Sequence, residues 1–221
     1  MPQAFIFDMN GTMIDDMHYH EQAWYDVLVN QLKAPLTVEQ VRHQIYGTAA
    51  EMFERVFGAE AFSAKEIESI TLNKESKYRK EFLPHLKLIA GLDDFLIQAK
   101  AKRIPLAIGT AAPLLNINFV LDNLKLRDLF RVVIGPDDVK KSKPDPEVFL
   151  KAASQLGIAP EQCIVFEDAP KGIEAASRAG MKAIAITSYH TAVELENDNV
   201  LFTIEDYTHP HLQNLLQIYD K

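Results

Sequence analysis

The sequence predicts an α/β protein in which an all-helical segment interrupts a core built on a parallel sheet. Short apolar runs alternate with helical patterns along most of the chain, which is typical of βαβ units. One early stretch carries helical patterns alone. The length of 221 residues suits one core with an insertion better than two equal domains.

Five short runs rich in Ile, Val and Phe are typical of strands that are buried on both faces of a sheet. Each run ends in a polar or small residue and is followed by a helical pattern, which favours parallel strands. The runs cover residues 4–7, 105–109, 131–134, 163–166 and 182–186. We expect one more short strand and a terminal helix within residues 201–221.

Proline and glycine mark the ends of the helices between these strands. Pro146 stands in the first turn of a predicted helix and Gly157 at its end. In the same way, Pro170 opens a helix that Gly180 closes. A further helical pattern covers residues 91–100.

Residues 16–84 are predicted to form the helical insertion, and residues 1–15 with 85–221 to form the core. Apolar side chains in the insertion recur at the spacing of amphipathic helices. They are Trp24, Leu28, Leu32, Met52, Phe53, Val56, Phe57, Ile67, Ile70 and Tyr78. The insertion therefore separates the first core strand from the second.

The composition argues against several classes of protein. There are 23 basic and 31 acidic residues, so the formal net charge is −8, which disfavours a nucleic-acid-binding surface. The single cysteine, Cys163, excludes an intramolecular disulfide, and no Lys or Arg precedes Lys33 as a targeting segment would require. No apolar run is long enough to span a membrane. We expect a soluble cytoplasmic protein, monomeric, with neither nucleic-acid nor membrane partners.

Polar side chains collect where the predicted strands end. Asp8 and Thr110 follow two of these strands, Glu167 and Asp168 follow another, and Lys143 lies in a loop after a fourth. Ligands of an open parallel sheet bind beyond the carboxyl ends of its strands, so we expect these residues to lie together. Carboxylates with a substrate phosphate suit Mg²⁺, and an ammonium group neutralises phosphate charge.

Each of these residues also has a plain structural alternative. Asp8 fits a turn acid, because the Asn-Gly pair at residues 10–11 is a hairpin signal. Thr110 fits the N-cap of a following helix as well as it fits a phosphate ligand. Lys143 fits a solvated loop lysine, and the acidic pair fits a helix start. Only their shared location favours a functional site.

In chain order, these residues resemble the four motifs of the haloacid dehalogenase superfamily. Residues 7–12, Phe-Asp-Met-Asn-Gly-Thr, are similar to its first motif, D-x-D-G-T, with one change. Thr110 resembles the second motif, Lys143 with the proline after it the third, and the acidic pair 167–168 the fourth. The resemblance spans the whole chain.

The helical insertion resembles the C1-type cap of that superfamily. Within it, His20, Trp24 and Gly47 are similar to the pattern of the beta-phosphoglucomutase-like phosphatases, and Lys74 resembles a cap lysine of that subgroup. His20 and Trp24 lie one helical turn apart, and Trp24 also fits the packing face of its own helix. The resemblance implies a Rossmann-like parallel sheet core with an inserted all-helical cap domain, whose four named residues bind substrate.

The resemblance also implies a mechanism. Asp8 would attack a phosphoryl group and form an aspartyl-phosphate. Thr110 and Lys143 would bind the phosphoryl oxygens, and the backbone beside Ala111 would bind substrate. Such transfer depends mostly on positioning and charge neutralisation.

The same resemblance implies a Mg²⁺ cofactor. Its ligands would be Asp8, the backbone carbonyl of Asn10 and Asp168, with Glu167 assisting. A hydrolytic dehalogenase needs no metal, so the acidic pair argues against that reaction.

Two departures from the family pattern bear on activity. Asn10 replaces the aspartate that serves as general acid and base, and loss of such a group costs about 10²–10⁴-fold in rate. It fits natural divergence or an introduced change that traps an intermediate. Residues 47–51 lack the arginine with which mutases of this type bind a second phosphate. The sequence therefore favours a Mg²⁺-dependent phosphohydrolase of a small phosphorylated metabolite, with a sugar-phosphate mutase or a weakly active phosphate-binding module as alternatives.

Overall fold

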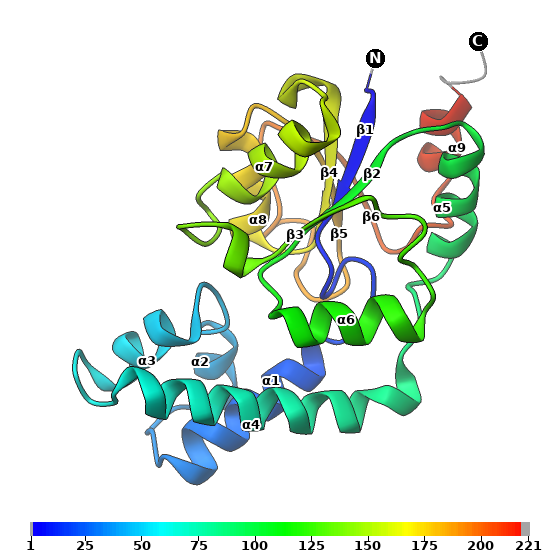
Figure 1. Ribbon diagram of the computed structural model, residues 1–221. Coiled ribbons are helices and arrows are strands. Elements are labelled where there is room, and N and C mark those ends of the chain that lie inside the picture. The colour runs from blue at the N-terminus through cyan, green and yellow to red at the C-terminus, as the bar shows by residue number, and fades with distance from the viewer. Residues whose placement is uncertain (1, 218–221) are drawn as a thin grey trace. The chain divides into compact units, whose positions relative to one another are not determined.

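The computed structural model describes residues 2–217 (Figure 1). The chain divides into two compact units, a core unit of Met1–Asp15 with Lys87–Lys221 and a helical unit of Asp16–Leu86. The chain thus returns from the helical unit to the core after Leu86, two residues later than the boundary expected at 84/85.

Six parallel strands form one sheet in the described part of the core unit. They are β1 (Ala4–Phe7), β2 (Leu106–Gly109), β3 (Val132–Ile134), β4 (Cys163–Glu167), β5 (Lys182–Ile186) and β6 (Val200–Ile204). Their spatial order is β3-β2-β1-β4-β5-β6, and every neighbouring pair is parallel. This is the doubly wound Rossmann order, which confirms the predicted fold class. From β1 the chain adds β2 and β3 on one side, and β4, β5 and β6 follow on the other side. The strand order therefore reverses between β1 and β4.

Helices flank this sheet on both faces (Figure 1). They are α5 (Leu92–Ala101), α6 (Leu114–Asn123), α7 (Glu147–Leu156), α8 (Pro170–Arg178) and α9 (Pro210–Gln217). Gly157 and Gly180 stand just beyond α7 and α8 with φ of 72° and 74°, as expected for glycine after a helix end. The predicted terminal strand and helix are β6 and α9, whereas residues 218–221 lie outside the described part.

Alternation along the strands divides the core packing into two layers. Ala4 and Ile6 of β1 belong to an aliphatic cluster with residues of α7 and α8. On the opposite face, Phe5 packs on Phe95 of α5 with ring centroids 5.5 Å apart, and Phe7 stacks on Phe166 at 4.5 Å. Both faces of β1 are therefore fully buried, and its end is held firmly in place.

The helical unit contains α1 (Met17–Tyr25), α2 (Val38–Arg42), α3 (Ala49–Phe57), α4 (Ala64–Phe82) and a π-helix at Asp26–Gln31. Thr37, Thr48 and Ser63 each form a capping box at the start of α2, α3 and α4, respectively. Trp24 and Phe53 lie in its apolar core. The structure describes all of residues 16–86 and contains no strand there, as the sequence predicts.

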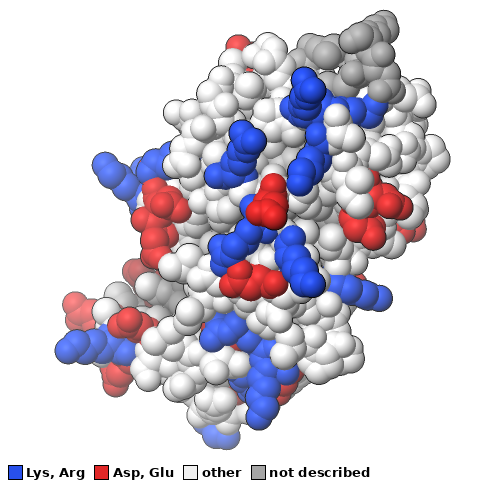
Figure 2. All heavy atoms as spheres, turned by 45° about the vertical axis from the view of Figure 1, so that its right-hand side comes forward, with Lys and Arg blue, Asp and Glu red and all other residues white. Residues whose placement is uncertain are grey.

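Charged side chains of both signs are interspersed on the face of the molecule in Figure 2. Elsewhere in the sequence, Lys171 and Arg178 pair with Glu174 on α8. Such exposed pairs contribute little to stability. Among the helices of residues 2–217, none has the length and apolar character that a membrane crossing requires.

Candidate active site

Three carboxylates meet at the point where the strand order reverses. Asp8 follows β1, Glu167 ends β4 and Asp168 comes next, and the two strands pair in register through Phe7 and Phe166. One carboxylate oxygen of each lies within 4.8 Å of the others, and all three residues are buried. This crevice is where ligands of doubly wound sheets bind.

Lys143 joins this cluster from the loop after β3. Its Nζ donates to Asp8 Oδ1 at 2.6 Å and to Glu167 Oε2 at 2.8 Å. Burial alone would lower the pKa of Lys143, but the charges of the two carboxylates hold that pKa above its ordinary value. The ammonium is therefore charged at neutral pH, so Lys143 is not the solvated loop lysine of the structural alternative.

The two acids after β4 ionise with difficulty. Burial raises the pKa of Glu167 to about 7, with Lys143 opposing the rise and Asp8 adding to it. Burial, followed by the charges of Glu167 and Asp8, raises the pKa of Asp168 well above its ordinary value. Like charges at short range need a cation to stay ionised. The all-oxygen donor set of these acids fits a hard divalent cation such as Mg²⁺.

A tight loop follows Asp8 and carries Asn10. Gly11 has a φ of 70°, its N–H donates to Ile14 O at 2.8 Å, and Asn10 forms an isolated bridge with Ile14. The alternative of a hairpin turn at residues 10–11 does not hold, because a type I′ turn needs positive φ at both positions and only Gly11 has it. Thr12 Oγ1 donates to Asp168 Oδ1 at 3.1 Å, which ties this loop to the acidic cluster.

Thr110 lies at the end of β2, next to β1 in the sheet. Its N–H donates to Ile134 O at 3.0 Å, and its Oγ1 accepts from the N–H of Ala112 at 3.1 Å. Helix α6 begins only at Leu114, so the alternative of a simple helix N-cap is wrong. Thr110 is buried, whereas Ala111 is exposed.

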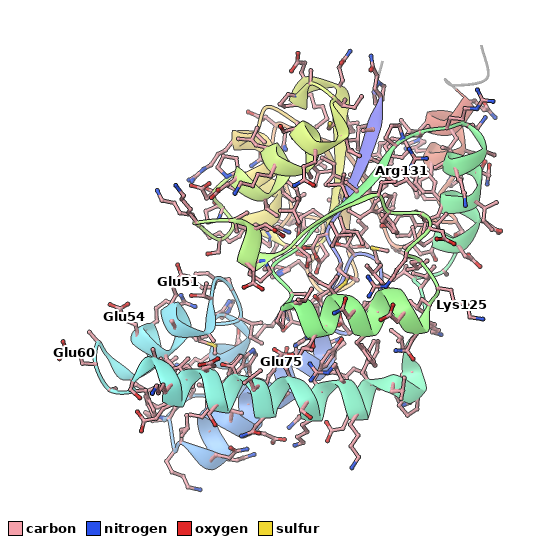
Figure 3. The ribbon with its side chains drawn as sticks, in the orientation of Figure 1. Glu51, Glu54, Glu60, Glu75, Lys125 and Arg131 are labelled. Carbon is pink, nitrogen blue, oxygen red and sulfur yellow. The ribbon has the colours of Figure 1, made fainter. Side chains whose placement is uncertain are left out.

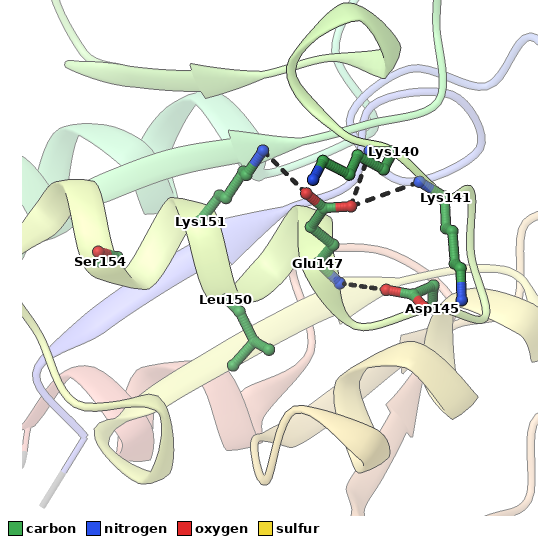
Figure 4. Close-up of a pocket in the computed structure, with 7 residues that line it drawn as sticks. All are labelled: Lys140, Lys141, Asp145, Glu147, Leu150, Lys151 and Ser154. Carbon is green, nitrogen blue, oxygen red and sulfur yellow. Dashed lines mark hydrogen bonds and ion pairs between the residues drawn. The ribbon is translucent and has the colours of Figure 1, made fainter.

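The loop that carries Lys143 is anchored by the first residue of α7 (Figure 4). Glu147 Oε2 accepts from the N–H groups of Lys140 at 2.7 Å and Lys141 at 3.3 Å. Its other oxygen lies 2.9 Å from Nζ of Lys151. One carboxylate thus orders the backbone just before Lys143.

A comparison with protein-family models matches residues 5–186 to the family described as haloacid dehalogenase-like hydrolase. The chain belongs to the haloacid dehalogenase-like hydrolases. Validoxylamine A 7'-phosphate phosphatase of Streptomyces hygroscopicus subsp. limoneus is 31% identical to this hydrolase over 214 residues, covering 96% of this chain and 99% of that protein. Beta-phosphoglucomutase of Bacillus subtilis strain 168 is 31% identical over 202 residues, or 83% of each protein.

Solved structures agree with this assignment. The crystal structure of a HAD hydrolase, family IA, variant 3, from Entamoeba histolytica HM-1:IMSS has a TM-score of 0.85 and 27% sequence identity, and covers 100% of both chains. The predicted membership is confirmed, including the beta-phosphoglucomutase-like subgroup, and the chain is an enzyme of the phosphohydrolase type.

Three of the predicted substrate-binding residues lie together in the helical unit of the hydrolase. Lys74 Nζ lies 2.6 Å from His20 Nδ1 and 4.7 Å from the ring centroid of Trp24. It also donates to Glu75 Oε1 at 2.8 Å, and His20 Nε2 lies 3.4 Å from Asp16 Oδ2. The Lys74 ammonium is therefore engaged by partners within its own unit.

Gly47 lies in another part of the helical unit, in the loop before α3. Its φ is 72°, and a Cβ there would overlap the carboxylate of Glu51, which accepts from the Thr48 N–H at 2.6 Å. Figure 3 shows Glu51, on α3, well apart from Glu75, the neighbour of Lys74 on α4. Gly47 therefore shapes the start of α3, and its role in substrate binding stays a prediction.

Glycines give the carboxyl groups of the acidic cluster their space, and of these Gly172 was not predicted from the sequence. A Cβ at Gly172, inside α8, would overlap the Glu167 carboxyl group, and one at Gly11 would overlap that of Asp168. A glycine inside a helix is unfavourable by propensity, so Gly172 did carry a signal of close packing. Ser188 and Tyr207 also contact the loop after Asp8, from positions so distant in sequence that no local pattern identifies them.

Proposed function

We propose that this hydrolase releases phosphate from a small phosphorylated metabolite in a Mg²⁺-dependent reaction that passes through an aspartyl-phosphate on Asp8. The observation that carries the proposal is the buried cluster of Asp8, Glu167 and Asp168 around the Lys143 ammonium. The relatives support the substrate class, because one is named as a phosphatase and another as a mutase of phosphorylated small molecules.

In the proposed first step, a carboxylate oxygen of Asp8 bonds to phosphorus while the bond from phosphorus to the substrate oxygen breaks, and the departing oxygen takes its proton from water because Asn10 has none to give. The Lys143 ammonium pairs with Glu167 as well as with Asp8, and its bond to Asp8 keeps that carboxylate oriented. The Thr110 hydroxyl and the backbone at Ala111 lie at the end of the next strand, where they would bind phosphoryl oxygens. Water then releases phosphate from Asp8 in the second step.

Asp8, Asp168 and the backbone carbonyl of Asn10 would hold Mg²⁺, with Glu167 assisting. The cation would supply charge neutralisation for the carboxylates and the phosphoryl group. The raised pKa values of Glu167 and Asp168 support this part of the proposal, because a cation relieves the cost of their ionisation.

We further propose that residues 16–84 act as a cap whose His20, Trp24, Gly47 and Lys74 contact the organic part of the substrate. The contact of Lys74 with His20 and Trp24 supports a shared role for these three. The single cysteine, which cannot form an intramolecular disulfide, supports a cytoplasmic location, and we propose that the enzyme acts as a monomer.

A sugar-phosphate mutase is the second candidate, because a beta-phosphoglucomutase is among the relatives. That reaction requires a site for a second phosphate, and residues 47–51 contain no basic side chain. Arg55 on α3 donates instead to the backbone carbonyls of Gln44 and Tyr46, each at 2.9 Å. These contacts favour a phosphatase.

The test measures phosphate release from an aryl phosphate, then from a panel of sugar and polyol phosphates, with Mg²⁺ and with EDTA. The intact protein, Asn10→Asp and Asp8→Asn are compared. We expect release that requires Mg²⁺, rises in Asn10→Asp and is lost in Asp8→Asn. Activity that survives both EDTA and Asp8→Asn would overturn the proposal, isomerisation without net phosphate release would favour the mutase, and binding of phosphate without turnover in any variant would favour a phosphate-binding module.

A further inference from the structure

Two side chains from the far end of the chain hold the loop that follows Asp8. Ser188 Oγ donates to the backbone carbonyl of Gly11 at 2.5 Å. The Tyr207 hydroxyl donates to the backbone carbonyl of Thr12 at 3.0 Å. The two donors are 177 and 195 residues away in sequence from their acceptors, so tertiary structure alone brings them there.

This loop needs such restraint because it contains a glycine in a left-handed conformation. Gly11 has a φ of 70° and, lacking a Cβ, has access to more backbone conformations than any other residue type. Because peptide groups are planar, fixing the Gly11 carbonyl fixes the peptide plane between Gly11 and Thr12. Fixing the Thr12 carbonyl does the same for the next plane. The two bonds therefore set the position of the Thr12 side chain, which donates to Asp168.

Tyr207 is rigidly held for this contact. It is 2% exposed, its ring centroid lies 5.7 Å from that of Phe166 and 6.4 Å from that of Phe7, and its N–H donates to Ala90 O at 2.9 Å. A buried hydroxyl without a partner costs free energy, and the Thr12 carbonyl supplies that partner. The ring thus fixes where the hydroxyl points.

Ser188 is anchored by the sheet itself. It comes just after β5, and the N–H of the preceding residue, Thr187, donates to Ile204 O of β6 at 2.9 Å. This backbone bond continues the pairing of β5 with β6 past Ile186 and does not depend on the Thr187 side chain. The ends of β5 and β6 therefore present Ser188 to Gly11 from a fixed support.

We propose that Ser188 and Tyr207 are positioning residues of the active site. They hold the Asn10–Thr12 segment so that Thr12 stays on Asp168 and the Asn10 backbone stays beside Asp8. The inference rests on the proposed function in one respect, since it takes the Asn10 carbonyl and Asp168 as ligands of Mg²⁺. Groups that orient metal ligands affect affinity strongly, and their loss typically costs about 10–100-fold.

The test titrates Mg²⁺ into the phosphate-free protein by calorimetry and follows amide hydrogen exchange in the peptide that spans residues 9–14. The variants are Ser188→Ala and Tyr207→Phe, which remove only the hydroxyl groups. Thr187→Val is the matched control, because it removes a hydroxyl-to-carbonyl bond one residue from Ser188 that does not involve the loop. Ser188→Thr keeps a hydroxyl at this position and tests whether the hydroxyl, rather than serine itself, supports Mg²⁺ binding.

We expect Ser188→Ala and Tyr207→Phe to weaken Mg²⁺ binding by about tenfold or more and to speed exchange in residues 9–14. Thr187→Val should change neither quantity, and Ser188→Thr should recover most of the affinity. Affinity and exchange equal to those of Thr187→Val would overturn the positioning role. If the unsubstituted protein binds no Mg²⁺, the metal part of the proposed function fails, and exchange in residues 9–14 still decides whether the two hydroxyls hold the loop.

Discussion

Replacing Lys143 with methionine should expose how much the cluster depends on one positive charge. The Lys143 ammonium lies 2.6 Å from Asp8 Oδ1 and 2.8 Å from Glu167 Oε2, with 11% of its side chain exposed. At an effective dielectric constant of about 20, each contact supplies about 6 kcal/mol of attraction, much of which offsets the cost of burying the ions. Methionine keeps the unbranched apolar stem, one atom shorter, and removes the charge.

The expected loss in the free energy of unfolding is about 3–5 kcal/mol at pH 7.5 without metal, the cost of leaving buried charges without their partner. Proton uptake should reduce this loss at lower pH, because the pKa of Glu167 is already raised and loses its main opposing influence when Lys143 is removed. The loss should therefore be smaller at pH 5.5 than at pH 7.5. Phosphate release should fall at the same time.

Urea unfolding in EDTA at both pH values measures these quantities. Lys151→Met is the matched control, because its ammonium pairs with Glu147 at 2.9 Å but has 41% of its side chain exposed. That control should lose no more than about 1 kcal/mol, as surface ion pairs do. Equal losses in Lys143→Met and Lys151→Met, or a loss that is independent of pH, would refute the electrostatic account of the cluster.

Three further outcomes are expected. Asn10→Asp should raise turnover by about 10²-fold or more, while the unsubstituted protein should show a burst of aryl alcohol before slow turnover. Peptide mass spectrometry verifies that Asn10 has not deamidated, and equal rates in the two proteins would then contradict the role assigned to position 10. In EDTA, the free energy of unfolding should fall as pH rises from about 4.5 toward 7, because folded Glu167 keeps a proton that the unfolded chain releases. Mg²⁺ should therefore raise the melting temperature more at pH 8 than at pH 5.5, and the opposite order would contradict the raised pKa of Glu167. Gly172→Ala should weaken Mg²⁺ binding about tenfold by displacing the Glu167 carboxyl group, whereas Gly157→Ala, whose Cβ meets nothing within 4 Å, should lower stability alone. Unchanged calorimetric affinity in Gly172→Ala would show that displacing Glu167 does not disturb the metal site.

The strands and helix ends of the core were predictable because their signals are local. Each of β1, β2 and β4 is a short apolar run, and Gly157 and Gly180 stand at left-handed positions that few other residues adopt. The loop after Asp8 was predicted less well. Its Asn-Gly pair is typical of a hairpin turn, but the bonds from Ser188 and Tyr207 hold the loop in another conformation. Those donors come from the other end of the chain, where no nearby residue indicates their target.

The acidic site was predictable for a topological reason. Residues that follow parallel strands must reach the same edge of the sheet, so Asp8, Thr110 and the pair at 167–168 converge whatever the intervening sequence. What the topology does not give is the packing around each group. Thr110 caps no helix, because α6 begins four residues later at Leu114. The clearance that Gly172 gives Glu167 likewise depends on how α8 lies against β4.

The net charge of the site explains why its carboxyl groups tend to hold protons when no cation is bound. Asp8, Glu167 and Asp168 carry three negative charges when ionised, and Lys143 supplies one positive charge, which leaves −2 in a buried crevice. Without a cation, the excess is relieved by protons, and the two groups whose pKa values are raised are Glu167 and Asp168. A divalent cation matches the same excess, so its binding should displace protons and tighten as pH rises. At a pH where these carboxylates are ionised, a phosphate dianion meets repulsion from a metal-free site at −2 and none from a site that a divalent cation has neutralised. Binding of Mg²⁺ and of the phosphoryl group must therefore favour each other, because such coupling is reciprocal.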